Sequence, residues 1–255
     1  MKKKISIVTP TYNEESNIKQ LCFSIAEEMQ KTNYEYEHIV IDNCSTDLTI
    51  SILKDLASLD KNLKIILNSR NFGHIKSPVH GILQATGDAV ILMTADFQDP
   101  ISLIPIYIEE WEKGNKVVMA QKNSSDEGKK INFIRKFFYK IIKFISDIPL
   151  LTNTTGAGLF DRKIIEEIRN INDPYPYFRG LISEITSEIK TIPFHQPKRA
   201  GGHTKNNFYT LYDIGVLGII KHSKLPLRIM TFIGLVTSFI SLIVASVFFF
   251  RKFFF

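Results

Sequence analysis

The sequence predicts an α/β protein with a mainly parallel sheet flanked by helices, followed by one membrane-spanning helix. Short β-branched segments alternate with helical segments over residues 4–93, the pattern of βαβ units. With 44% apolar and 23% charged residues, the 255-residue chain has enough apolar side chains for a full core. Residues 229–250 carry no charge. A helix of that length reaches roughly 33 Å, enough to cross a hydrocarbon core of about 30 Å.

The elements are expected in strand–helix order from the N-terminus. Each strand is a short β-branched or apolar run that ends in turn residues, and each helix has apolar residues three or four positions apart. The second helix follows a polar loop whose Ser or Asp side chains suit a helix N-cap. We expect strands at residues 4–9, 38–42, 64–68, 89–93 and 116–120, and helices at residues 13–29, 48–59 and 77–85.

Polar residues follow four of these strands, where ligands of open parallel sheets bind. These residues are 9–14, 42–43, 68–71 and 94–99. The sequence contains no G-x-G-x-x-G after its first strand and no P-loop, which argues against a dinucleotide-binding fold and a P-loop NTPase. It also lacks H-E-x-x-H, a nucleophile elbow and paired C-x-x-C, which disfavours hydrolase and structural-zinc functions.

Five residues at these strand ends suggest metal or nucleotide binding. Asp96, Gln98 and Asp99 offer hard oxygen ligands of the kind that Mg²⁺ or Mn²⁺ shares with phosphates; a turn or helix cap is the alternative role of this acidic stretch. Asp42 could accept hydrogen bonds from a base or ribose, or cap the next helix. Tyr12 could stack on a base, although an ordinary surface tyrosine is the alternative.

The charge pattern points to a membrane. The chain carries a net charge of +6, and residues 129–143 hold six lysines or arginines without an acid. Apolar residues interleave with them at helical spacing, so residues 131–145 read as an amphipathic helix in the headgroup region or as a core-facing helix with a basic edge. Because this stretch has apolar bulk rather than exposed stacking platforms, no nucleic acid partner is expected. Two cysteines without metal spacing fit a cytoplasmic body.

Several segments in this order resemble the inverting family 2 glycosyltransferases of GT-A (Rossmann-like) fold, and among them the polyprenyl-phosphate sugar transferases of the dolichol-phosphate mannose synthase type. The resemblance spans nearly the whole chain. Its segments are residues 9–14, 40–47, 69–73, 85–88, 95–100, 155–162, 178–181, 199–205 and 225–228.

This resemblance implies a set of site residues. The nucleotide-binding residues are Pro10, Tyr12, Glu14, Val40, Asp42, Ala95 and Asp96. The implied metal ligands for Mg²⁺ or Mn²⁺ are Asp96 and Gln98. Arg199 and Lys205 match the basic pair that grips the diphosphate, and with Asp96 they are the implied catalytic residues.

The chain departs from the family pattern at three places. Thr94 stands where the family usually has an acid, so a lower metal affinity is expected, and Asn43 stands where it usually has Asp. A basic residue normally follows the strand at 116–120, where this chain has Gln121 and then Lys122. The candidates for binding the acceptor phosphate are Lys122, Arg135 and Lys136.

The expected function is transfer of a hexose, from a UDP-sugar rather than a GDP-sugar, to a polyprenyl phosphate with inversion at the cytoplasmic face of the inner membrane. A lipid phosphate is already nucleophilic at pH 7, so the reaction needs no base. The expected divisions are a catalytic domain at 1–210, a juxtamembrane segment at 211–228 and a transmembrane helix at 229–250; a homo-oligomer is one expectation for the assembly.

Two alternatives remain open. A saccharide or lipid-linked oligosaccharide acceptor would need a carboxylate base, for which Glu184 and Asp161 are the nearest candidates. Thr94 motivates the second alternative, a nucleotide-sugar-binding membrane protein with impaired catalysis.

Overall fold

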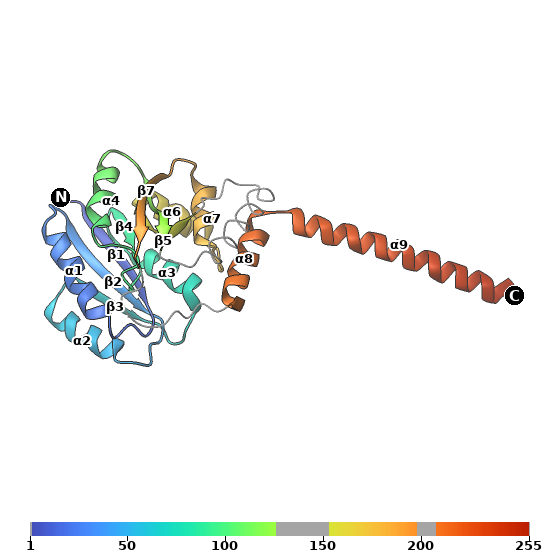
Figure 1. Ribbon diagram of the computed structural model, residues 1–255, viewed down its shortest axis with the longest axis horizontal. Coiled ribbons are helices and arrows are strands. Elements are labelled where there is room, and N and C mark those ends of the chain that lie inside the picture. The colour runs from blue at the N-terminus through green and yellow to red at the C-terminus, as the bar shows by residue number, and fades with distance from the viewer. Residues whose placement is uncertain (1, 126–152, 198–207, 255) are drawn as a thin grey trace.

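The computed structural model describes residues 2–125, 153–197 and 208–254. Its strands form one seven-stranded sheet in the order β3-β2-β1-β4-β6-β5-β7, with helices on both faces (Figure 1). The strands are β1 (Lys4–Thr11), β2 (Glu35–Asp42), β3 (Leu63–Leu67), β4 (Ala89–Leu92), β5 (Val117–Ser125), β6 (Thr154–Asp161) and β7 (Lys190–Gln196). The helices are α1 (Ile18–Gln30), α2 (Thr49–Leu59), α3 (Gly73–Gln84), α4 (Leu103–Glu112), α6 (Arg162–Ile171), α7 (Phe178–Ile185), α8 (Phe208–His222) and α9 (Leu225–Phe254).

The sheet is mainly parallel, as expected. β1 pairs in parallel with β2 and β4, β2 with β3, and β5 with β7, whereas β6 runs antiparallel to both β4 and β5. All the described strands except β6 therefore end at the same edge, which we call the carboxyl edge. The opposite edge is the amino edge.

Both faces of the sheet are buried, which explains why its central strands read as continuous apolar runs. Successive side chains alternate between the faces. Ile7 of β1 packs with α1, α2 and α4 in one core cluster, and the adjacent Val8 packs with α3, α6 and α7 in the other. The result is a three-layer α/β/α body that holds the carboxyl edge rigidly.

The expected elements are present, with two displaced helix starts. α1 begins at Ile18 rather than residue 13, because Asn13 has a left-handed φ of 53° and the amides of Asn17 and Ile18 first close a turn on the Glu14 carbonyl. α3 begins four residues before the expected start and contains Pro78 in its interior. Proline has no N–H to donate within the helix, so the first turn of α3 depends more on contacts from outside it.

A single helix in the described part of the chain is long and apolar enough to cross a membrane. This is α9, whose 30 residues include the expected span at 229–250 and reach about 45 Å. None of its residues is buried, and Figure 1 shows it projecting away from the α/β body. The juxtamembrane segment expected at 211–228 is largely the helix α8, which begins before residue 210. The amphipathic helix expected at 131–145 lies outside the described residues.

Candidate active site at the carboxyl edge

The loops that follow β1 and β2 are joined to each other by hydrogen bonds. The Asn13 amide donates to the Ser45 hydroxyl at 2.8 Å, and the Thr46 amide donates to Asn13 Oδ1 at 2.8 Å. The Glu14 amide donates to the Thr49 hydroxyl at 2.9 Å. Together, these contacts fix the backbone on either side of the carboxyl ends of β1 and β2, where the sequence places its nucleotide-binding residues.

Asp42 ends β2 and is fully buried. Its carboxylate accepts hydrogen bonds from the amide of Ser45 at 2.8 Å and from the Ser45 hydroxyl at 2.5 Å. Cys44 between them has a φ of 67°, and this left-handed conformation turns the chain back toward the carboxylate. Asp47, and not Asp42, accepts a hydrogen bond from the first-turn amide of α2, that of Thr49. Asp42 is therefore held by its own loop, and the carboxylate that meets the start of α2 is that of Asp47.

Asn43 connects this loop to the loop before α3. Its side-chain amide donates to Asn71 Oδ1 at 2.8 Å and to the Gly73 carbonyl at 3.3 Å. Its side-chain oxygen accepts from the Phe72 amide at 2.8 Å and from Asn68 Nδ2 at 3.2 Å. An aspartate at this position could not donate the first two bonds. The departure from the family pattern thus has a structural role, because Asn43 joins the carboxyl ends of β2 and β3.

The stretch after β4 separates its two aspartates into different environments. Thr94 Oγ1 lies 2.8 Å from Asp96 Oδ1 and 2.8 Å from Asp99 Oδ2, and the Gln98 amide donates to Asp96 Oδ1 at 3.2 Å. Asp96 is half-buried, whereas Asp99 is only 1% exposed. Burial raises the pKa of the Asp99 carboxyl, although its hydrogen bond with Thr94 acts in the opposite direction. Phe97, with a φ of 58°, makes the sharp turn between them.

The donor set suits a metal ion that is shared with a bound phosphate. Asp96 and Gln98 offer carboxylate and amide oxygens, the hard ligands that Mg²⁺ and Mn²⁺ prefer. No group of three or more His, Cys, Asp or Glu side chains in the described ranges could hold a metal ion. These residues therefore fit an ion that takes its remaining ligands from a diphosphate and water, as Mg²⁺ commonly does, rather than a cage built from protein alone.

The other expected nucleotide-binding residues differ in how far their side chains are buried. Pro10 and Tyr12 are half-buried at the carboxyl edge, and Glu14 there is buried and accepts a hydrogen bond from Asn17 Nδ2 at 2.8 Å. Ala95 is buried beside Asp96. Val40, also expected to contact the nucleotide, has its side chain fully buried in a core cluster, and its strand is paired on both sides.

The expected phosphate-binding residues are described only in part. Lys122 lies on β5, which runs in the same direction as β1, so it stands toward the carboxyl edge as well. Arg135, Lys136, Arg199 and Lys205 lie outside the described residues.

The two carboxylates considered as bases for a saccharide acceptor have other partners. Asp161 lies at the amino edge opposite Ala89, where it caps α6 and accepts a hydrogen bond from Trp111 Nε1 at 2.8 Å. Glu184 on α7 has its Oε1 2.9 Å from His222 Nδ1 of α8. Asp161 thus lies at the edge of the sheet opposite to Asp96. The Glu184 carboxylate contacts a second helix, so neither residue is arranged as a base beside Asp96.

The sequence did not predict the side-chain contacts that support the site. Ser45, Asp99 and Asn71 contact Asp42, Thr94 and Asn43 respectively. Asp99 was expected only as one of the hard oxygen ligands after β4. The available signal was the clustering of small polar residues in each loop after a strand. It indicates that such side chains bond locally, but it does not say to which partner.

The chain belongs to glycosyl transferase family 2, whose match covers residues 6–169. It is 33% identical over 241 residues to the prophage bactoprenol glucosyl transferase homolog of Escherichia coli strain K12, covering 94% of this chain and 79% of that protein. It is 32% identical over 239 residues to the bactoprenol glucosyl transferase of Shigella phage SfV, covering 93% and 78%. The chain is therefore an enzyme that transfers sugars.

Solved structures confirm the GT-A fold. TarS 1-349 of S. aureus, in complex with UDP-GlcNAc, has a TM-score of 0.55 and 20% identity, covering 86% of this chain and 67% of that one. The mannosyltransferase PcManGT of Pyrobaculum calidifontis, in complex with GDP-Man and Mn²⁺, has a TM-score of 0.53 and 16% identity, covering 84% and 61%.

Proposed function

We propose that this enzyme transfers a hexose from a UDP-sugar to a polyprenyl phosphate, with inversion at the anomeric carbon and with the help of Mg²⁺ or Mn²⁺. The observation that carries the proposal is the position of Asp42 and Asp96. Asp42 ends β2 and Asp96 follows β4, and these are the two strands that flank β1. A nucleotide lying over the end of β1 would meet Asp42 at its base or ribose and Asp96 at its diphosphate.

Two observations support a lipid acceptor. The E. coli and Shigella phage relatives carry bactoprenol in their names, and bactoprenol is a polyprenyl lipid. In this chain, α9 is an apolar helix without a buried residue, and it follows α8, which contacts the catalytic body. A membrane-anchored enzyme meets a polyprenyl phosphate at the membrane surface, where the phosphate lies outside the hydrocarbon. We place the catalytic body at the cytoplasmic face of the inner membrane.

The chemistry requires positioning and charge neutralisation more than proton transfer. A phosphate monoester is largely dianionic near pH 7, so it can attack the anomeric carbon without a base. This agrees with the partners of Asp161 and Glu184, neither of which is arranged as a base beside Asp96.

The remaining roles follow from the resemblance and from charge. A divalent ion, when bound by Asp96 and Gln98, supplies positive charge to the leaving diphosphate. Arg199 and Lys205 bind the same diphosphate, and Lys122, Arg135 and Lys136 bind the phosphate of the acceptor. Each of these cations stabilises negative charge that the reaction redistributes.

The test is sugar transfer by the full-length chain in detergent. Radiolabelled UDP-glucose, UDP-GlcNAc and GDP-mannose are each supplied with undecaprenyl phosphate, in Mn²⁺, Mg²⁺ or EDTA. We expect a glycolipid from a UDP-sugar, metal dependence, and an anomeric configuration opposite to that of the donor by NMR. Asp96→Asn should lower kcat by about 100-fold or more, because it removes the carboxylate at the diphosphate.

The matched control is Asp55→Asn, on an exposed position of α2, which should leave kcat unchanged. If the enzyme transfers the sugar to a free saccharide and forms no glycolipid, its acceptor is a saccharide and not a polyprenyl phosphate. Donor binding without transfer to any acceptor would point to a protein with impaired catalysis, and binding of no donor at all would refute the proposal.

A further inference from the structure

We infer that Thr94 is a positioning residue whose hydroxyl orients Asp96, and that the site therefore takes up its divalent metal together with the nucleotide rather than before it. The inference rests on the proposed function and concerns the same site. It assigns a role to the residue at which this chain departs most clearly from the family pattern.

The first step is the geometry of the Thr94 hydroxyl. Its oxygen lies 2.8 Å from Asp96 Oδ1 and 2.8 Å from Asp99 Oδ2. A hydroxyl has one proton, so at any moment Thr94 donates to one of these two carboxylate oxygens while its oxygen stays in contact with the other. The hydroxyl thus links the half-buried Asp96 to the buried Asp99.

The second step is that Asp99 acts as the fixed end of this link. It is only 1% exposed, and it lies near the fully buried Tyr107, whose pKa is raised by burial and by the Asp99 charge. A carboxyl group that is so enclosed keeps its orientation. Because Thr94 contacts both carboxyl groups, it also restricts the orientation of Asp96. Asp96 Oδ1 accepts a further hydrogen bond from the Gln98 amide at 3.2 Å.

The third step concerns the charge available to a cation. In the described part of the chain, the stretch after β4 leaves Asp96 half-buried and keeps Asp99 inside, and no group of three metal-type side chains is formed. Hard divalent cations lose hydration water reluctantly and need several anionic oxygens in return. A diphosphate supplies such oxygens. Metal and nucleotide should therefore each strengthen the binding of the other, by the same factor.

Three substitutions at position 94 separate the roles of its hydroxyl and its charge. Thr94→Val keeps the shape and removes the hydroxyl, so Asp96 loses its orientation. Thr94→Ser keeps the hydroxyl and should behave like the wild type. Thr94→Asp places a third carboxylate beside Asp96 and Asp99, and a cation relieves the repulsion between like charges. This variant should bind the metal without a nucleotide.

The experiment measures Mn²⁺ binding by the full-length protein in detergent, from the EPR signal of free Mn²⁺, with no nucleotide, with UDP and with GDP. For the wild type we expect UDP to lower the dissociation constant of Mn²⁺ by about tenfold or more. Thr94→Val should weaken Mn²⁺ binding in the presence of UDP by about tenfold, the usual effect of losing a partner of a metal ligand. Thr94→Asp should tighten binding of Mn²⁺ alone by about tenfold.

Thr86→Val is the matched control, since it also removes a threonine hydroxyl that donates to a carboxylate, that of Glu37 at 2.8 Å, but at the amino edge. It should lower thermal stability and leave Mn²⁺ binding unchanged. Tight Mn²⁺ binding by the wild type without nucleotide would overturn the inference, and so would equal binding by Thr94→Val and Thr94→Ser. If neither nucleotide binds under any condition, the proposed function fails; equal Mn²⁺ binding by Thr94→Asp and the wild type without nucleotide would overturn, separately, the premise that the missing charge at position 94 limits metal binding.

Discussion

His38 is a single buried residue with a consequence for the whole fold. It lies in β2 with 2% of its surface exposed, and its Nε2 is 3.0 Å from the Thr9 hydroxyl of β1. Burial lowers its pKa from 6.5 to about 3. The imidazole is therefore neutral in the folded protein at every pH at which the enzyme is expected to work, whereas the same side chain in the unfolded chain takes up a proton near pH 6.5.

This difference predicts acid sensitivity. Between pH 6.5 and about 3, the unfolded chain binds more protons at His38 than the folded chain does, so stability falls as the pH falls through that window. From pH 7 to pH 5, His38 should lower the free energy of unfolding by about 2 kcal/mol. Denaturant unfolding in detergent at both pH values measures this effect. His38→Gln should remove that part of the pH dependence, and an unchanged pH dependence in this variant would contradict the assignment.

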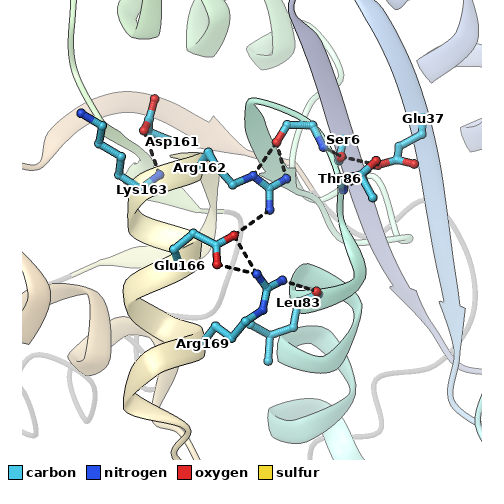
Figure 2. Close-up of polar contacts among 10 residues, drawn as sticks. Ser6, Glu37, Leu83, Thr86, Asp161, Arg162, Lys163, Glu166 and Arg169 are labelled. Carbon is cyan, nitrogen blue, oxygen red and sulfur yellow. Dashed lines mark hydrogen bonds and ion pairs between the residues drawn. The ribbon is translucent and has the colours of Figure 1, made fainter.

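The amino edge shows how whole elements are joined. The Glu37 carboxylate of β2 is almost fully buried; it accepts the Ser6 hydroxyl of β1 at 2.6 Å and the Thr86 amide before β4 at 2.8 Å (Figure 2). Its other oxygen pairs with Lys64 of β3 at 2.5 Å and with Lys4 of β1 at 3.0 Å. Burial alone would raise the pKa of Glu37, but the hydrogen bonds from Lys64, Ser6 and Thr86 lower it well below its usual range. One carboxylate thus connects four neighbouring segments of the sheet.

Replacing the Glu37 carboxylate should lower the free energy of unfolding much more than replacing an exposed carboxylate nearby. Glu37→Gln removes the charge that Lys64, Ser6 and Thr86 stabilise, and we expect a loss of about 2–3 kcal/mol in the free energy of unfolding at pH 7. Glu166→Gln is the control: Glu166 of α6 pairs with Arg169 at the surface, with 43% of its side chain exposed, and should cost under about 0.5 kcal/mol (Figure 2). The two variants are compared by denaturant unfolding.

The pH profile provides an internal check on Glu37. Because the folded-state pKa is lowered, its stabilisation is present above the unfolded pKa near 4.5 and is lost as the pH falls below it. The gap between wild type and Glu37→Gln should therefore narrow in acid. A gap that is constant down to pH 3 would indicate that packing, not charge, is lost.

The strands and loops of the site show which of its features could be predicted from the sequence. Asp42 and Asp96 could be predicted because the carboxyl ends of parallel strands meet at one edge, a consequence of backbone direction alone. The start of α1 could not, because it depends on the left-handed Asn13, whose side chain is held by the loop after β2. The contacts of Ser45 with Asp42 and of Asp99 with Thr94 could not be predicted for a related reason: these partners are set by side-chain geometry, which an alternating pattern does not encode. Val40 was expected to bind the nucleotide only because of the family resemblance, and its side chain lies in the core.

At the scale of the whole molecule, α8 joins the catalytic body to the exposed helix α9. Lys221 pairs with Asp173, before α7, at 2.8 Å, and His222 Nδ1 lies 2.9 Å from Glu184 Oε1. The His222 ring also packs beside Tyr177, with 5.5 Å between ring centroids. These contacts hold the C-terminal end of α8 against the body, just before α9 begins. If α9 crosses a membrane, we expect the position of α8 to set how far the carboxyl edge lies from the lipid surface.

Gly180 of α7 provides a test of this joint, because it allows the His222 ring to lie directly against the helix. A Cβ at Gly180 would lie 1.9 Å from His222 Nε2, and the ring is pinned by Glu184 and is 4% exposed. Gly180→Ala should therefore displace His222, although alanine is otherwise favoured in a helix by about 1 kcal/mol. We expect the KM for undecaprenyl phosphate to rise by about tenfold while the affinity for UDP changes little, since misplacement affects the lipid acceptor first. Limited proteolysis should show faster cleavage between α8 and α9.

Gly234→Ala in α9, where a Cβ meets nothing within 4 Å, is the matched control and should leave both the KM for undecaprenyl phosphate and the affinity for UDP unchanged. A loss of UDP affinity in Gly180→Ala equal to its loss of acceptor affinity would show that α8 supports the catalytic body in general and does not set its distance from the lipid.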